Sequence, residues 1–201
     1  MIQTASVFAD VEMEIYAAVQ KPISLIWTGT EFIFSSGSDE VKLFTLSVNG
    51  TTIEPFAPSF SGVKDVNLVI SKGYGDFPFR HVYASSGDTI YEIDNSGEYV
   101  NEYVTLTKDE DITSLIFDTN GFWSFDLIAA TSDGIVWRID STGEIRPIID
   151  FGVGNIPESI VIAPEDYDGF QGYLLVALKG NSSIFAVSSK DNSVKVLIEN
   201  L

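Results

Sequence analysis

Apolar residues recur along the chain in short runs, and the same order of runs returns every 40 to 50 residues. The clearest register is an aliphatic–aromatic pair whose copies lie 46 to 48 residues apart: Leu43-Phe44, Ile90-Tyr91, Val136-Trp137 and Ile184-Phe185. A second register, 43 to 47 residues apart, contains Leu25-Ile26, Leu68-Val69, Leu115-Ile116 and Ile160-Val161. Short runs that are rich in β-branched and aromatic residues predict β-strands, and each repeat has room for four of them.

Turn residues separate the runs at matching places in the repeats. Asn49-Gly50, Asn95-Ser96-Gly97 and Ser141-Thr142-Gly143 all follow the third run of their unit. Glycine and asparagine supply the positive φ that tight β-turns require. Four antiparallel strands that repeat every 40 to 50 residues are typical of the blades of a β-propeller. The alternative is a β-sandwich with accidental self-similarity, but the agreement of four registers across four units favours the propeller.

We therefore expect an all-β chain that forms a single β-propeller domain over residues 1–201. Its four-stranded antiparallel blades of 43–48 residues are expected at about 22–60, 65–107, 111–151 and 157–201. An extra outer strand at 4–9 precedes them, because Phe8-Ala9 matches Phe56-Ala57 one repeat later. Residues 10–20 are the one helix candidate, with Asp10 as N-cap, although their alternation also fits a strand. Three arrangements stay open: a closed ring of four blades, a piece of a larger ring, or an open arc completed by another subunit.

Composition and charge narrow the range of partners. Eleven basic residues stand against 29 acidic ones, and a net charge of −18 predicts no nucleic-acid binding and no membrane insertion. With no cysteine and with His81 as the one histidine, disulfides, thiolate zinc sites and multi-histidine metal sites are excluded. No secretory signal or transmembrane run is recognisable. The location stays open: extracellular or surface if a leader has been removed, otherwise cytoplasmic or in a virion.

One blade carries a family resemblance. The stretch PESIVIAP at 157–164 precedes GFQGYLLVA at 169–177, and VWRID at 136–140 precedes Gly143. This pattern resembles the blades of NHL, gluconolactonase-like and TolB-like propellers over about residues 22–201. Most such propellers have six blades, whereas this chain offers four. In gluconolactonase-like enzymes a glutamate after proline binds a divalent metal in the central channel, and Pro157-Glu158 matches that fragment, although the asparagine and aspartate ligands have no match here.

Carboxylates form two candidate metal sites, and no cofactor is certain. The resemblance implies Glu158 as a ligand, and Asp65 and Asp111 stand at comparable points before inner strands, so three carboxylates would ring the channel mouth. Asp166 and Asp168 lie in an acidic loop that could hold calcium, although it lacks the distal glutamate of an EF-hand. Calcium or another divalent cation is thus an option. Solvated strand ends and turns are the simpler interpretation in so acidic a chain.

Aromatic residues in the longer loops are the remaining candidates for binding: Tyr74, Phe77, Trp123, Tyr167 and Phe170. Loops on a rigid scaffold are where binding residues accumulate, so we expect a non-catalytic binding or assembly module. Its partner would be a protein or glycan rather than a small molecule, and the chain could form a homo-oligomer or a larger assembly. The alternatives are a divalent-metal-dependent lactonase- or esterase-like hydrolase and a structural subunit of a virion or surface assembly. Nucleophilic catalysis has little support, because no Gly-x-Ser-x-Gly elbow exists and His81 opens a predicted strand.

Overall fold

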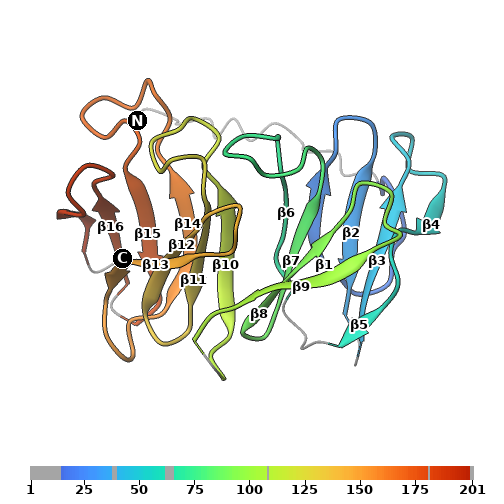
Figure 1. Cartoon of the computed structure of the whole chain (residues 1–201), viewed down its shortest axis with the longest axis horizontal. Helices are drawn as coiled ribbons and strands as arrows, with labels where there is room; N and C mark the ends of the chain where they lie inside the picture. The colour runs from blue at the N-terminus through green and yellow to red at the C-terminus, as the bar shows by residue number, and fades with distance from the viewer. Residues whose placement is uncertain (1–14, 38–39, 62–65, 108, 181, 200–201) are drawn as a thin grey trace, which may run out of the picture.

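The described strands form four antiparallel sheets, one for each sequence repeat (Figure 1). The computed structural model describes residues 15–37, 40–61, 66–107, 109–180 and 182–199. The first sheet contains β1 (Pro22–Trp27), β2 (Phe32–Ser36), β3 (Glu40–Leu46) and β4 (Ile53–Pro55), and β5 (Phe60–Ser61) also pairs with β3. The second contains β6 (Leu68–Ile70), β7 (Val82–Ser86), β8 (Thr89–Ile93) and β9 (Val100–Thr105). The third contains β10 (Ile112–Phe117), β11 (Leu127–Thr131), β12 (Ile135–Ile139) and β13 (Ile145–Asp150). The fourth contains β14 (Pro157–Ile162), β15 (Leu174–Leu178), β16 (Ser183–Val187) and β17 (Val194–Ile198).

Each sheet is a meander in which neighbouring strands follow one another in the chain. The first strands of the four sheets lie innermost, since β1 contacts β6, β6 contacts β10, and β10 contacts β14. This radial arrangement of four-stranded sheets confirms the predicted all-β, propeller-type fold. We therefore refer to the four sheets as blades one to four.

Alternation along the strands gives every blade two apolar faces. In blade two, Leu68 pairs with Ala84 and both pack toward blade one. The next cross-strand pair, Val69 and Tyr83, packs toward blade three. Because successive side chains on a strand point to opposite faces, a single blade contributes to two separate cores.

Three hydrophobic cores therefore connect the blades in sequence. One lies between blades one and two, one between blades two and three, and one between blades three and four. Among the described residues, no core joins blade four to blade one, and these two blades lie at opposite ends of the long axis (Figure 1). The described part of the chain thus forms an open arc.

The segment before β1 differs from expectation. Residues 15–20 are not helical, so the helix prediction is wrong for them. Their contacts explain the extended path, because the Tyr16 ring meets Phe32 edge-on at 6.2 Å and its hydroxyl donates to the carbonyl of Val48. Residues 10–14 and the expected outer strand at 4–9 lie outside the described residues. Nowhere in the described ranges is there a helix long and apolar enough to cross a membrane.

Aspartates stabilise turns between outer strands through local hydrogen bonds. The Asp140 carboxylate accepts from the Thr142 hydroxyl at 2.6 Å and from its backbone N–H at 2.9 Å. Asp191 accepts from both donors of Ser193 in the same way. These bonds, the side-chain hydroxyl bond first, hold the pKa of each aspartate below its ordinary value of 3.8.

Lowered carboxylate pKa values make the stability of these turns depend on pH. The contribution is present above pH 3.8 and is lost as the pH falls through the lowered pKa of the folded protein. We expect the double variant Asp140→Asn/Asp191→Asn to melt below the wild type at about pH 6, and this gap to narrow as the pH falls below 3.8. Melting curves across this range test it. The exposed control Asp168→Asn should follow the wild type, and a gap that persists in acid would contradict the assignment.

Candidate functional site

Three long loops project from the same edge of the arc, at the top in Figure 1. Residues 71–81 join β6 to β7, 118–126 join β10 to β11, and 163–173 join β14 to β15. We call these three segments the loop surface. The equivalent connection of blade one, 28–31, is much shorter, so blade one contributes little to this edge.

Asp118 organises the central loop around its buried carboxylate. Its Oδ1 accepts the backbone N–H groups of Asn120 and Gly121, both at 3.1 Å. Its Oδ2 accepts those of Trp123 at 2.7 Å and Phe125 at 2.9 Å. Phe125 has φ of 64°, which is uncommon for a non-glycine residue, and the hydrogen bonds compensate for that local strain. One side chain therefore fixes the path of the whole loop.

Trp123 and Phe122 lock the central loop to the loop of blade four. The indole Nε1 of Trp123 donates to the carbonyl of Gly172 at 3.0 Å, and the indole is 1% exposed. Gly172 has φ of +71°, and a Cβ at this position would collide with the Phe122 ring. Only glycine fits there, because any side chain would separate the two loops.

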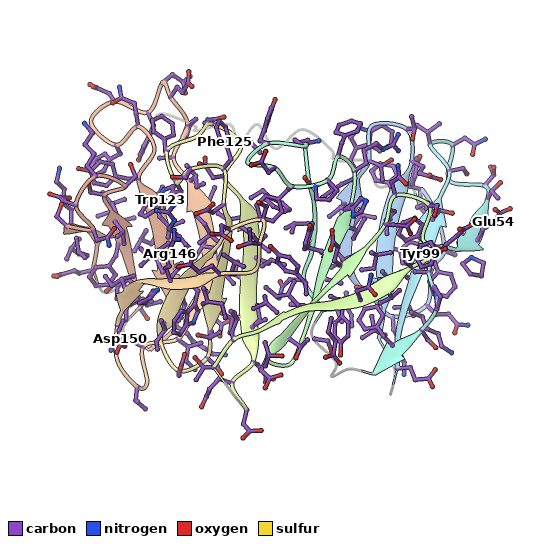
Figure 2. The ribbon with its side chains drawn as sticks, viewed as in Figure 1. Glu54, Tyr99, Trp123, Phe125, Arg146 and Asp150 are labelled. Carbon is purple, nitrogen blue, oxygen red and sulfur yellow. The ribbon has the colours of Figure 1, made fainter. Side chains whose placement is uncertain are left out.

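Phe125 makes the corresponding connection to the loop of blade two. Its ring centroid lies 5.4 Å from that of Tyr74, and a Cβ on Gly75 would approach the Phe125 Cβ to 2.9 Å. Figure 2 shows Phe125 at the upper edge of the arc, above Trp123. The loops of three consecutive blades are thus interlocked into one continuous surface.

Aromatic rings and carboxylates share the exposed side of this surface. Tyr74, Phe79 and Tyr167 are 49%, 64% and 46% exposed. Phe170 is half-buried and forms a chain of ring contacts, at 5.9 Å to Tyr167 and 5.4 Å to Tyr173. The Lys195 ammonium lies over the Phe170 and Tyr173 rings, at 5.4 and 5.2 Å from their centroids. Exposed carboxylates accompany these rings: Asp76, Glu165, Asp166 and Asp168.

The five predicted binding aromatics separate into two groups. Tyr74, Tyr167 and Phe170 present ring surface to solvent. Phe77 and Trp123 are 3% and 1% exposed, and Phe77 packs edge-on against Tyr83 and Phe117 in the core between blades two and three. These two residues support the loops from below and offer no ring face to a ligand in this conformation.

Two features of the loop surface escaped the sequence analysis. Phe79 is the most exposed aromatic residue of the loop surface, and the sequence does not distinguish this exposed loop aromatic from the buried Phe77. Asp118 was overlooked as an organising residue, although Asp118-Thr119-Asn120-Gly121 carries a turn signal that could have identified it.

A polar depression lies at the other end of the inner strands, with a volume of about 430 Å³. All four blades line it: Ile23 and Ser24, Val66 and Asn67, Asp111 to Thr113 with Ser132, and Ile156, Glu158 and Lys179. We call it the basin. Asp111 and Glu158 both line this depression, while Asp65, the third carboxylate of the predicted channel-mouth site, lies outside the described residues.

Glu158 already has a cationic partner in the basin. Its Oε1 lies 2.9 Å from the Lys179 Nζ, and the hydrogen bond to Glu158 raises the pKa of Lys179. In the described ranges, no three Asp, Glu or His side chains gather closely enough to hold a metal ion. The metal assignments of Glu158 and Asp111, and the calcium assignment of Asp166 and Asp168, stay predictions.

His81 is tied into the blade by a short hydrogen bond. Its Nδ1 lies 2.8 Å from the Glu92 Oε1, which also accepts from the Tyr83 hydroxyl at 2.9 Å. Burial, together with the nearby Glu92 carboxylate, raises the pKa of Tyr83. Glu92 thus holds the histidine at the start of β7, and Tyr83 in turn orients Glu92.

Comparisons with known proteins give the fold and no family. No family model and no curated protein sequence matches the chain. A catalytically inactive variant of virginiamycin B lyase from Staphylococcus aureus, solved with quinupristin, matches 92% of the chain at 16% identity with a TM-score of 0.70. The extracellular domain of a protein described as a one-component system from Bacteroides thetaiotaomicron matches 94% at 14% identity with a TM-score of 0.67.

The lengths of these relatives matter for the shape of the arc. The chain spans 58% of the lyase and 24% of the Bacteroides protein. For the computationally designed Ika4 protein, the match includes 94% of this chain and the whole of the design, at 14% identity with a TM-score of 0.52. The computationally designed Ika8 protein is matched over 47% of its length by 86% of this chain, at 14% identity with a TM-score of 0.55. At these identities the similarity shows the fold alone.

The Asp118 assignment predicts a large loss of stability on substitution. In Asp118→Ala, four backbone N–H groups lose their acceptor, and burial of unsatisfied donors costs about 1–3 kcal/mol for each group that water cannot reach. We expect the free energy of unfolding to fall by about 3 kcal/mol or more in urea titrations. Asp168→Ala, an exposed change in the neighbouring loop, should cost about 0.5 kcal/mol or less. Equal effects of the two variants would refute the role of Asp118.

Melting curves with chelator and with millimolar calcium, magnesium or manganese test the basin carboxylates. Because the Lys179 ammonium competes with a metal ion for the Glu158 carboxylate, we expect no rise in Tm that depends on Glu158. A metal that binds only the folded state at a hundredfold excess over Kd would stabilise it by about 2.7 kcal/mol, a shift of several degrees. A metal-selective shift that Glu158→Ala removes and Asp150→Ala retains would instead support the hydrolase alternative.

Proposed function

We propose that the chain is a non-catalytic binding module whose loop surface docks a protein partner with a basic surface. The observation that carries this proposal is the interlocking of three loops through Asp118, Trp123 and Phe125. Loops that are already fixed lose little conformational entropy on binding, and preorganisation of this kind is a main source of affinity.

The exposed aromatic residues support a protein partner. Tyrosine is enriched among the residues that dominate binding energy, because its ring buries a large area at a low cost in side-chain entropy. Tyr74 and Tyr167 are both about half-exposed and are supported from the side by Phe125 and Phe170. The rings are therefore held in place while one face of each stays accessible.

The charge of the loops indicates the sign of the partner. Four exposed carboxylates surround the aromatic rings (Asp76, Glu165, Asp166 and Asp168) and outnumber the exposed cations there, Lys72 and Lys195, and the chain as a whole carries −18. Such a field accelerates association with a basic surface and disfavours acidic partners. We therefore expect the affinity to weaken as salt concentration rises.

The shape of the loop surface favours a protein over a glycan or a small molecule. The hollow lined by Tyr74, Phe117, Asp118 and Phe125 has no room even for a molecule the size of water. Small ligands are usually bound in clefts of about 300–1,000 Å³, whereas protein interfaces are broad and often flat. The hydrolase alternative needs Glu158 as a metal ligand, and the ion pair of Glu158 with Lys179 does not support that role.

Selection of peptides from a random library on the immobilised protein tests the proposal. We expect enriched peptides to combine Lys or Arg with aromatic residues. Their affinity should fall about tenfold or more for Tyr74→Ala/Tyr167→Ala, as the loss of two binding hot spots requires. Tyr99→Ala is the matched control, because Tyr99 is 65% exposed but lies at the start of an outer strand, away from the loops (Figure 2).

Two outcomes would contradict the proposal. Peptides that bind the Tyr74→Ala/Tyr167→Ala variant as well as the wild type would place the binding surface elsewhere. Binding of oligosaccharides on a glycan array, lost in the same variant and retained in Tyr99→Ala, would assign the loop surface to glycans instead.

A further inference from the structure

The loop of blade four contains two aromatic rings that meet nearly at a right angle. The ring centroids of Phe170 and Tyr173 lie 5.4 Å apart, and the ring planes are inclined at 76°. We call this pair of rings the aromatic corner. Because the two rings turn their faces toward a common space, a single small group placed there can contact both of them.

A cation already occupies the aromatic corner. The Lys195 Nζ lies over both rings, at 5.4 Å from the Phe170 centroid and 5.2 Å from the Tyr173 centroid. Attraction between a cation and a ring face is significant within about 6 Å of the centroid. Within the part of the chain that the structure describes, Lys195 forms no ion pair, although the sequence contains 29 acidic residues. The two ring faces, rather than a carboxylate, therefore hold this ammonium group.

The backbone of the loop fixes the aromatic corner without any contribution from Lys195. The Ala163 N–H donates to the Tyr173 carbonyl at 2.8 Å, and the Gly172 N–H donates to the Ala163 carbonyl at 3.0 Å. The Tyr173 N–H donates to the Phe170 carbonyl, also at 3.0 Å. None of these hydrogen bonds includes Lys195, so the corner should keep its shape when the lysine leaves it.

Lys195 reaches the corner from a different element of the blade. It lies on β17, where it pairs with Ala186 of β16, and its side chain is exposed. A lysine ammonium is carried on a flexible stem of four carbons, and its exposed contacts with aromatic rings are weak. Another ammonium group can therefore replace that of Lys195 at little cost.

The chemistry of the corner selects its ligand. Its present occupant is a primary ammonium on an alkyl chain, so its size and charge suit a lysine side chain. Glu165, Asp166 and Asp168 are exposed in the same loop, and their negative charge attracts cations and repels anions. An apolar side chain would contact the rings without gaining from this charge, and an anion would be repelled.

We propose that the aromatic corner is a subsite for a lysine ammonium of the basic partner, and that Lys195 occupies it until the partner's lysine displaces it. This inference rests on the proposed function, since the remainder of the loop surface supplies the rest of the interface. In the free protein Lys195 is an internal competitor. Only the fraction of molecules with an open corner can bind, so the competitor weakens the apparent affinity by that fraction.

Titration with Nα-acetyl-lysine methylamide, followed through the NMR signals of the Phe170 and Tyr173 ring protons, tests the subsite without a protein partner. We expect Lys195→Ser to bind this probe about threefold more tightly than the wild type, because the competing ammonium is gone. Lys190→Ser is the matched control. Lys190 is another exposed lysine, in the turn before β17, and it has no ring contact. Its removal changes the net charge equally and should leave the affinity at the wild-type value.

Two further comparisons separate the ammonium from the rings. Nα-acetyl-norleucine methylamide has a similar chain without the charge, and Lys195→Ser should bind it at least about threefold more weakly than the lysine probe. Phe170→Leu added to Lys195→Ser removes one ring face but keeps an apolar side chain, and it should abolish the gain in affinity with unchanged circular dichroism. Tyr173→Leu, in the same background, repeats this test if the Phe170 variant does not fold.

Three results would overturn the subsite: equal affinity of the wild type and Lys195→Ser for the lysine probe, an equal gain in Lys190→Ser, or equal binding of the norleucine probe. The proposed function fails separately. If no basic peptide binds the loop surface while Lys195→Ser shows the expected gain with the lysine probe, the subsite is supported and the docking role is not. Selected lysine-containing peptides that lose affinity in Tyr74→Ala/Tyr167→Ala but gain none in Lys195→Ser would support docking and overturn the subsite.

Discussion

The alternation of side chains across each four-stranded sheet is the constraint on which the rest of the structure depends. A sheet with two apolar faces cannot be buried by one neighbour, so every blade requires a blade on each side. Leu68 and Val69 illustrate this, because adjacent residues of β6 belong to cores on opposite sides of the blade. The stacking of consecutive blades in the described part of the chain follows from this requirement.

The loop surface depends on the same stacking of blades. The inner strands lie side by side, so the loops that follow them also lie side by side and can contact one another. The Trp123 indole contacts Gly172, and Phe125 contacts Tyr74 and Gly75. Rigidity at this edge is thus a product of blade packing and of one buried carboxylate, Asp118. The basin at the other end of the inner strands is more polar, and there Lys179 forms an exposed ion pair with Glu158.

Sequence periodicity was sufficient for the fold because the repeats share one register. The pairs at Leu68-Val69 and Ile160-Val161 already contain both faces of a blade. The candidate site was less accessible. Phe77, Phe79 and Trp123 look alike as loop aromatics, and their burial differs only through tertiary contacts that no local pattern encodes. The role of Asp118 depends on four backbone N–H groups that turn toward one carboxylate. Near Tyr16, packing of its ring on Phe32 favours an extended segment over the expected helix.

The restriction of contacts to neighbouring blades also shapes how the protein loses structure. A blade in the middle of the arc is held by two interfaces, whereas an end blade is held by one, so the energetic coupling resembles that of a linear array. Such arrays open from their ends, and their cooperativity falls as the end interfaces weaken. In the single chain, amide hydrogens of β7 and β11 should therefore exchange with solvent later than those of β2 and β15. Closure of a ring would remove this difference, because a ring has no end blade.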